Sequence, residues 1–273
     1  MKKKTLTLVM VVLTVLATGV QAISAQKVTI QTQTMVGKEL KLPGILHKPS
    51  GEGPFPAIVM LCGAGGYGSE PDATQQSTWA ERLVSWGYVA LQLDSFSPRG
   101  YPNGVNDNTL RVDNFTRARD AFSAKFFLST LAYVDPKNIA VIGWSHGGWA
   151  VMSIIDAYAR DKDVSPFKAA VAFYPYCSPV QEPDTPVLVL IGKKDDWCPA
   201  SLAESVKEDY RVKNWKPEFS LTVYPNASHA FDYETTPPEG RVVQGHHLEY
   251  DPEATSDAIN QTKAFLAKYC SEQ

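Results

Sequence analysis

The sequence predicts a mainly parallel sheet of about eight strands flanked by helices on both faces. Short, nearly continuous apolar runs alternate with longer stretches of helical period, as in parallel strands buried on both faces. The chain has 273 residues, 44% hydrophobic and 20% charged, which is ordinary for a globular protein. No linker, repeat or low-complexity tract divides it after the N-terminal segment. We therefore expect residues 26–273 to form a single α/β domain.

The expected elements follow from the period of the apolar residues. Strands are expected at residues 28–35, 40–46, 57–61, 88–93, 139–142, 169–173, 187–191 and 221–224. The first alternates like an exposed strand and can pair with the second, whereas the others are continuous apolar runs. Helices are expected at residues 73–86, 114–131, 147–160, 200–212 and 257–268. Ligands of such sheets bind outside the carboxyl ends of the strands, so we expect the chemistry there.

The first 25 residues have the composition of a secretory signal peptide. Three lysines precede an apolar run over residues 6–20, and Ala22 and Ala25 close two suitable cleavage sites. The run is short for a membrane span and its far flank is uncharged; an uncleaved anchor is the alternative. We expect a periplasmic or secreted protein with no stable membrane association after cleavage. Cleavage would change the formal charge from −3 to −6, which gives no electrostatic reason to bind nucleic acid.

Four cysteines are present, and an exported protein is allowed disulfides. Cys177 and Cys198 follow neighbouring apolar runs, so a bridge between them is possible, although sequence cannot fix the connectivity. No C-x-x-C or closely spaced Cys/His set occurs, so we expect no metal site and no cofactor. The adjacent pair His246 and His247 is expected in a surface loop.

Residues 143–148 read Gly-Trp-Ser-His-Gly-Gly and directly follow an apolar run. This G-x-S-x-G pattern is typical of a nucleophile elbow, where a strand turns sharply into a helix and presents the serine, here Ser145, at the turn. The glycines are needed because a strained turn brings neighbouring backbone too close for a Cβ atom. Such a short pattern also arises by chance, so the other polar residues at strand ends must support it.

Two kinds of side chain that could activate a serine follow later strands. Asp195 and Asp196 come after residues 187–191, and His229 comes just after residues 221–224. A serine needs a base to take its proton, and a carboxylate then orients the imidazole and stabilises its charged form. The order serine, aspartate, histidine along the chain is that of α/β-hydrolases. We therefore predict a catalytic triad, with either aspartate as its acid.

Attack by the serine creates an oxyanion that needs two backbone N–H donors. We expect these from His146, next to the nucleophile, and from Ala64 in the glycine-rich loop after residues 57–61. The same loop contains Gly63, Gly65 and Gly68, a G-x-G-x-x-G spacing that also occurs in dinucleotide-binding proteins. A nucleotide-binding oxidoreductase is therefore an outside alternative. It is disfavoured because the third glycine lies in a loop and the triad residues would be left unexplained.

The sequence resembles the dienelactone hydrolase family of the α/β-hydrolases over about residues 54–268. The segments that carry the resemblance stand in the family's order and are residues 62–66, 94–100, 143–148, 192–199 and 228–232. The resemblance implies an α/β-hydrolase fold and hydrolysis of a small ester or lactone through an acyl-enzyme, without a cofactor. The family pattern G-x-x-D-x-x-x-P, matched by Gly192 and Pro199, implies Asp195 rather than Asp196 as the acid.

The sequence departs from the family at two positions. The namesake enzymes use a cysteine where Ser145 stands, which favours a general carboxylic-ester hydrolase over a dienelactonase. Related sequences often carry histidine in place of Cys62, so the details of the pocket cannot be transferred. A peptidase or an acyltransferase on the same fold is the alternative activity, and a binding protein without turnover is the non-enzymatic one.

Five further residues are candidates for substrate binding. Arg99 could form a bidentate pair with a substrate carboxylate, and a structural pair with Asp94 is the alternative. The aromatic residues Trp144, Trp149, Tyr176 and Trp197 flank the predicted catalytic positions and could line an apolar pocket for an aryl or acyl group. Aromatic residues near strand ends also commonly serve in packing alone.

Overall fold

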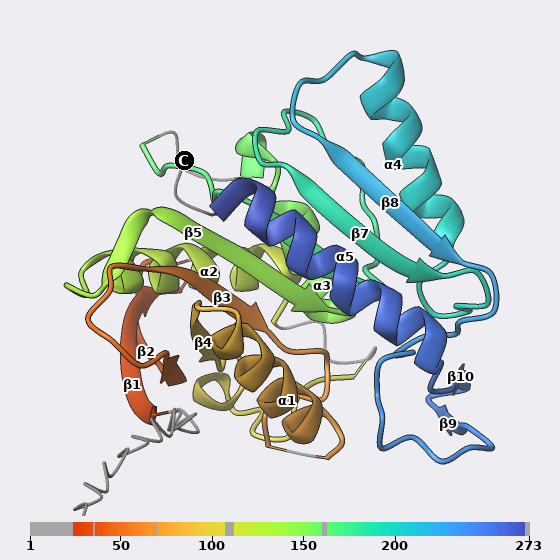
Figure 1. The fold of residues 1–273 in the computed structure, drawn as a ribbon, viewed down its shortest axis with the longest axis horizontal. Helices are drawn as coiled ribbons and strands as arrows, with labels where there is room; N and C mark the ends of the chain where they lie inside the picture. The colour runs from red at the N-terminus through yellow and green to blue at the C-terminus, as the bar shows by residue number, and fades with distance from the viewer. Residues whose placement is uncertain (1–23, 35, 69, 107–111, 160–162, 271–273) are drawn as a thin grey trace, which may run out of the picture.

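An eight-stranded sheet runs through the molecule (Figure 1). The structure is a computed structural model that describes residues 24–34, 36–68, 70–106, 112–159 and 163–270. Its order is β1-β2-β4-β3-β5-β6-β7-β8. The bounds are β1 Ser24–Gln33, β2 Glu39–Lys48, β3 Phe55–Leu61, β4 Val89–Leu93, β5 Val134–Trp144, β6 Ala170–Phe173, β7 Val187–Gly192 and β8 Phe219–Tyr224. Each neighbouring pair from β4–β3 to β7–β8 is parallel. At the other edge, β1 pairs antiparallel with β2, and β2 pairs antiparallel with β4. The predicted fold class is confirmed.

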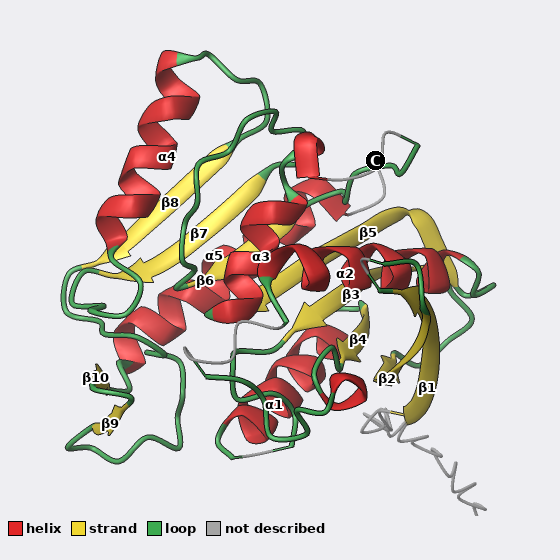
Figure 2. Ribbon diagram, turned by 180° about the vertical axis from the view of Figure 1, so that it is seen from behind, coloured by secondary structure: helices red, strands yellow, loops and turns green. Residues whose placement is uncertain are grey.

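Five helices cover the two faces of this sheet. They are α1 Asp72–Ser85, α2 Asn114–Ser129, α3 His146–Ile154, α4 Ala200–Val212 and α5 Pro252–Cys270. Helices α1 and α5 lie on the face nearer the viewer in Figure 1, and α2 and α3 lie on the opposite face, seen in Figure 2. Short 3₁₀ helices at Ser97–Arg99 and Ala157–Ala159 follow β4 and α3.

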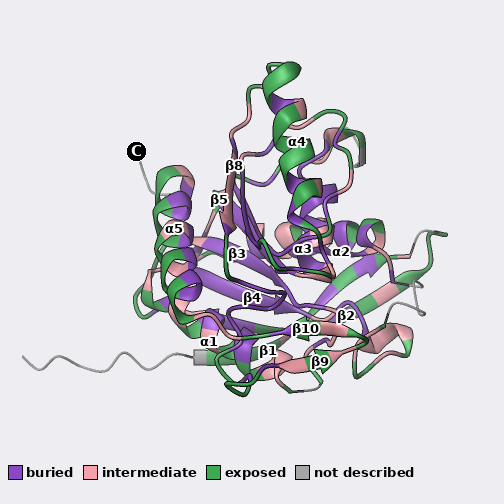
Figure 3. Cartoon of the chain, turned by 90° about the vertical axis from the view of Figure 1, so that its right-hand side faces the viewer, coloured by how far each residue is buried: buried purple, intermediate pink, exposed green. Residues whose placement is uncertain are grey.

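The sheet separates two hydrophobic cores. In β3, Val59 packs with α2 and α3 on one face, whereas Ile58 and Met60 pack with α1 and α5 on the other. Figure 3 shows the central strands buried between the helices. Burial on both faces explains why these strands read as continuous apolar runs instead of alternating ones.

None of the four cysteines forms a disulfide, and all four are buried. Cys177 belongs to the core beneath α2 to α4 and Cys198 to the core beneath α1 and α5. The disulfide considered between these two residues is therefore absent. Burial raises the pKa of the Cys62, Cys177 and Cys270 thiols to about 12 in each case, which keeps them protonated at neutral pH.

A small hairpin beside the carboxyl ends of the strands was not predicted. It consists of β9 Arg241–Val243 and β10 His246–Leu248, so the two histidines expected in a loop lie in a strand. Gln244 and Gly245 connect the strands with positive φ angles of 52° and 91°, as a tight hairpin turn requires. Strands of three residues are too short to show an apolar period.

The predicted signal peptide lies outside the described residues except for Ser24 and Ala25, which open β1. Across the residues that the structure describes, no helix is both long and apolar enough to cross a membrane.

Candidate active site

The G-x-S-x-G segment forms a sharp turn between β5 and α3. β5 ends at Trp144 and α3 begins at His146, so Ser145 alone makes the turn, with φ 50° and ψ −113°. Its N–H donates to the Phe173 carbonyl oxygen at 3.0 Å, which ties the turn to β6. A non-glycine residue in this region of backbone space is strained, and such strain concentrates at functional sites.

The two glycines of the pattern are required by close backbone contacts. A Cβ atom on Gly143 would lie 2.3 Å from the Gly147 carbonyl oxygen. One on Gly147 would lie 2.0 Å from the Leu61 carbonyl oxygen at the end of β3. Any side chain at either position would push the elbow away from the sheet, so the steric argument from the sequence holds.

A continuous chain of hydrogen bonds joins Ser145, His229 and Asp195. Ser145 Oγ lies 2.9 Å from His229 Nε2, and His229 Nδ1 lies 2.8 Å from Asp195 Oδ2. The other oxygen, Asp195 Oδ1, accepts from the backbone N–H groups of Trp197 at 3.0 Å and Cys198 at 2.7 Å. Since an ionised carboxylate only accepts, Nδ1 carries the proton and the Nε2 lone pair faces the serine hydroxyl.

Asp196 lies outside this chain. Its carboxylate pairs with His246 Nδ1 of the hairpin at 3.2 Å, and its side chain is 53% exposed. The Asp195 side chain, by contrast, is fully buried in its pair with His229. The geometry therefore favours Asp195 as the group that orients the imidazole.

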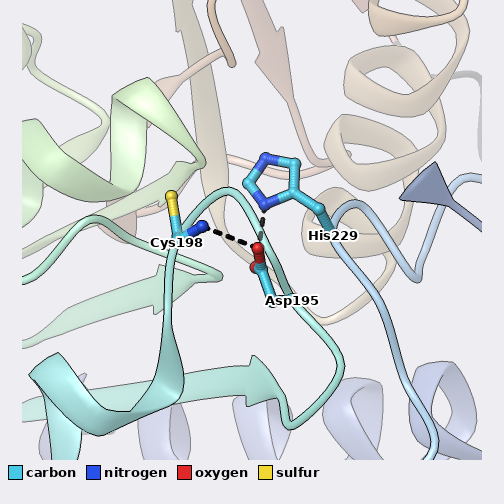
Figure 4. Close-up of side chains that lie close together, drawn as sticks. All are labelled: Asp195, Cys198 and His229. Carbon is cyan, nitrogen blue, oxygen red and sulfur yellow. Dashed lines mark hydrogen bonds and ion pairs between the residues drawn. The ribbon is translucent and has the colours of Figure 1, made fainter. Parts of the chain in front are cut away.

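Asp195, His229 and Cys198 are also close enough to be considered as metal ligands, with their donor atoms within 4.8 Å of one another. Both Asp195 oxygens already accept hydrogen bonds. Figure 4 shows that the Cys198 backbone N–H, and not its sulfur, faces the carboxylate. A metal here would displace the Nδ1 proton of His229, so hydrogen bonding accounts better for the cluster than ligation does.

Ser145 opens into a cavity of about 320 Å³ with mainly apolar walls. The cavity is lined by Ala64, Val105, Asn106, Ser145, His146, Trp149, Tyr176, Trp197 and Cys198. It thus brings together the nucleophile position, both residues expected to supply oxyanion N–H donors, and three of the four predicted aromatic residues, Trp149, Tyr176 and Trp197.

Trp144 does not line this cavity, so its predicted role in substrate binding is wrong. Its side chain is fully buried and donates from Nε1 to Asp232 Oδ2 at 3.1 Å. The same buried carboxylate accepts from Tyr174 at 2.6 Å, Trp79 at 2.9 Å and Gln75 at 3.0 Å. Asp232 therefore organises a polar cluster beneath the site, and Trp144 belongs to that cluster.

Arg99 is also engaged elsewhere, and its predicted contact with substrate is wrong. Its guanidinium forms two parallel hydrogen bonds with Asp120 at 2.8 and 2.9 Å and another with the Ser95 carbonyl oxygen at 2.7 Å. Asp94, the structural partner considered from sequence, accepts instead from two backbone N–H groups of the following turn at 2.8 and 3.0 Å. The partner of Arg99 could not be read from sequence because Asp120 lies on α2.

The glycine-rich loop is filled by protein atoms. A Cβ atom on Gly65 would lie 2.2 Å from a carboxylate oxygen of Asp72, and one on Gly68 would lie 2.1 Å from the Pro102 carbonyl oxygen. A pyrophosphate needs free N–H groups at a helix N-terminus, whereas here oxygens of the protein pack against the loop. The oxidoreductase alternative is therefore disfavoured.

A smaller recess of about 130 Å³ adjoins Ser145 on the His229 side. Its polar walls include Asp72, Tyr233 and Arg241, and the Tyr233 hydroxyl donates to Asp72 at 2.8 Å. None of these three residues was singled out in the sequence. They come from α1, the loop after His229 and the hairpin, so only tertiary structure brings them together.

Comparison with known proteins places this chain in a family. The family model described as "Dienelactone hydrolase family" matches residues 42–270. A Synechocystis protein named "Putative carboxymethylenebutenolidase" is 22% identical over 254 residues, which cover 84% of this chain and 93% of that protein.

Solved structures show the same fold. The structure described as "Putative Dienelactone Hydrolase" from Klebsiella pneumoniae superposes with a TM-score of 0.71 at 22% identity. The match covers 91% of this chain and all of that one. Dienelactone hydrolase from Anabaena variabilis gives 0.62 at 18% identity, covering 90% of this chain and 99% of that one. With the family model matched over most of its length, this chain belongs to the dienelactone hydrolase family and is a carboxylic-ester hydrolase of the α/β-hydrolase fold.

Proposed function

We propose that Ser145, His229 and Asp195 form a catalytic triad that hydrolyses carboxylic esters or lactones through an acyl-enzyme. The observation that carries this proposal is the unbroken chain of hydrogen bonds of 2.9 and 2.8 Å from the Ser145 hydroxyl to the Asp195 carboxylate. The strained elbow presents that hydroxyl at the mouth of a cavity large enough for a small ester.

The hydrogen bonds from Asp195 to His229 and on to Ser145 support a mechanism in which His229 carries its proton on Nδ1. His229 Nε2 takes the proton of Ser145 as the serine oxygen attacks the ester carbonyl, and Asp195 stabilises the imidazolium that forms. The backbone N–H groups of Ala64 and His146 bind the oxyanion of the tetrahedral intermediate. The imidazolium then protonates the leaving alkoxide. Water, deprotonated by the same imidazole, then attacks the acyl-enzyme. As the bond to Ser145 breaks, the imidazolium returns this proton to the serine oxygen and the carboxylic acid leaves.

The cavity walls support a preference for neutral esters with an aryl or short alkyl group. Trp149, Tyr176 and Trp197 supply flat apolar surfaces beside Ser145. An aromatic or aliphatic group gains by leaving water for such walls, whereas an ionised group would be desolvated there without a partner. Ester hydrolysis is therefore expected to extend well beyond dienelactones.

The proposal is tested with a fluorophosphonate probe and a panel of aryl esters, alkyl esters, lactones and amides. The wild-type protein should be labelled and should turn over esters, and Ser145→Ala should lose both properties. Ser178→Ala is the matched control, because Ser178 accepts a hydrogen bond from Trp149 at 3.1 Å and makes no contact with His229. A wild-type protein that is neither labelled nor active on esters would disprove the triad. Faster turnover of amides, or transfer to an added alcohol in preference to water, would favour a peptidase or an acyltransferase.

For the N-terminal segment we propose export by a signal peptide cleaved after Ala22. Its support is the lysine-led apolar run together with the register of β1, in which Ser24 and Ala25 pair with Lys48 and His47. Cleavage after Ala22 leaves these pairs intact, whereas cleavage after Ala25 removes them from the sheet edge. Mass spectrometry of the protein from its native host should find Ile23 at the N-terminus. An intact N-terminus on the mature protein would contradict export by cleavage.

A further inference from the structure

Arg117 lies beneath the proposed oxyanion hole without any exposure to solvent. From α2 its guanidinium points in two directions. One nitrogen donates to the Cys62 carbonyl oxygen at 2.8 Å, and the other lies 3.1 Å from His146 Nδ1. The guanidinium also stacks on the Phe96 ring, with its carbon 4.6 Å from the ring centroid.

No carboxylate neutralises this guanidinium by direct pairing within the described ranges of the chain. Asp120, a nearby acid on the same helix, is held through both oxygens by Arg99. The Cys62 thiol is no counter-ion, because burial raises its pKa to about 12. A charge buried without an ion pair opposes folding, so its presence calls for a functional explanation.

The contact with His146 also settles the state of that imidazole. A guanidinium only donates, so His146 Nδ1 accepts and the proton sits on Nε2. Burial first, and then the Arg117 charge, lower the pKa of His146 to about 3. His146 is therefore neutral throughout the working pH range, and the positive charge beside it belongs to Arg117 alone.

We propose that Arg117 is a positioning residue that fixes both halves of the oxyanion hole. The inference rests on the proposed function, since an oxyanion arises only if Ser145 attacks an ester. The Cys62 carbonyl directly precedes the loop that carries Ala64, and the His146 imidazole belongs to the residue that supplies the second N–H. One planar cation thus holds the two donors at a fixed separation. Its buried charge also favours the negative oxygen that forms in the transition state.

This role differs measurably from a merely structural one. A residue that only supports the fold changes the unfolding midpoint and leaves the turnover of folded enzyme unaltered. A residue that positions oxyanion donors changes kcat, because the oxyanion forms in both acylation and deacylation, and it changes KM little. Affinity for a boronic acid, which forms a tetrahedral adduct with the serine, should then fall in parallel with kcat.

The test compares Arg117→Met with the wild type and with Arg99→Met. We expect Arg117→Met to lower kcat by about 10- to 100-fold, somewhat less than removal of an oxyanion donor itself. KM should stay within about twofold, and phenylboronic acid should bind more weakly by a factor similar to the loss of kcat. Arg99→Met is the matched control, because it removes a partly buried arginine that makes no hydrogen bond to Cys62 or His146. Folded Arg99→Met should keep the wild-type ratio of boronic acid to substrate affinity.

Arg117→Lys provides the second variant. It keeps the charge, but a single ammonium cannot reach both partners in the fork geometry, so kcat should lie between those of the wild type and Arg117→Met. The proposal would be overturned if either variant folds and keeps the wild-type kcat and boronic acid affinity. If Arg117→Met does not fold, Arg117→Lys decides alone. Failure of the proposed function is distinct, since the wild type itself would then resist the fluorophosphonate.

Discussion

Asp195 and Asp196 are adjacent in sequence, yet their carboxylates lie in different surroundings. Asp195 is buried against His229, and Asp196 is half exposed beside His246. We expect Asp195→Asn to lower kcat/KM by about 10³- to 10⁴-fold, because an amide favours the wrong tautomer of the imidazole. Asp196→Asn should lower it by less than about fivefold, since an exposed pair is worth under about 1 kcal/mol. Ester kinetics of the two variants decide, and a larger loss in Asp196→Asn would reverse the assignment.

The backbone of Ser145 leads to a prediction about stability. Its φ of 50° with ψ of −113° is accessible to glycine and strained for any residue with a Cβ atom. Ser145→Gly should therefore be more stable than Ser145→Ala by about 1 kcal/mol or more, within the usual range of such backbone strain. Both variants should be inactive, so urea unfolding provides the comparison. Equal midpoints with equal slopes would show that the turn stores no strain.

Sequence sufficed for the residues whose chemistry is local and failed for those whose partner is distant. Ser145 and His229 could be predicted because an elbow and a strand end mark their positions. Trp144 could not, because its partner Asp232 is 88 residues away and is recognised only once the sheet is assembled. Arg117 gave no signal, because a single arginine on a helix resembles any surface residue until its burial is known.

One carboxylate links the beginning of β8 to the end of α5. Glu218 at the start of β8 accepts from Lys268 and Tyr269 at the end of α5 and from Ser220, and together these partners lower its pKa to about 2. Because this pKa lies below the ordinary value of 4.5, the stabilisation is complete above about pH 5 and is lost as the pH falls from 4.5 towards 2.

Glu218→Gln should therefore destabilise the protein at pH 7 and less so at pH 3. Solvent screens the partly exposed carboxylate, so the loss at pH 7 should not exceed about 1 kcal/mol. Urea unfolding at the two pH values measures the difference. Glu204→Gln, which removes an exposed pair with Lys193, is the control and should have a smaller effect. A loss that is the same at pH 3 and pH 7 would argue against the ionised carboxylate as its source.

At the scale of elements, the spacing of apolar residues predicted every strand of the main sheet and each of the five helices. The predicted end of α3 was wrong: it was expected at residue 160 and lies at Ile154. The helix stops there because the Asp156 carboxylate accepts from the backbone N–H groups of Gln181 and Glu182, both at 2.9 Å, and so holds the chain to a distant loop. Such a tertiary contact outweighs local helix propensity and leaves no mark in the period.

At the scale of the whole molecule, the fold buries the cysteine thiols. All four cysteines are buried, and none forms a disulfide. We expect Cys62, Cys177 and Cys270 not to react with a thiol reagent such as dithionitrobenzoate in native buffer, and to react in urea; Cys198 is set apart because it lines the cavity beside Ser145. The rate of labelling at intermediate urea should follow global unfolding, because access requires opening of the core. Rapid labelling of one of these three thiols in native buffer would reveal a local opening.

Absence of disulfides has a consequence for how the protein reaches its native state. A chain whose stability depends on cross-links must wait for an oxidant and for an isomerase to correct wrong pairings. In this protein two apolar cores, one on each side of the sheet, supply the stability instead. Maturation is therefore expected to be independent of the redox poise of the compartment, and refolding yields with and without a reducing agent should be the same.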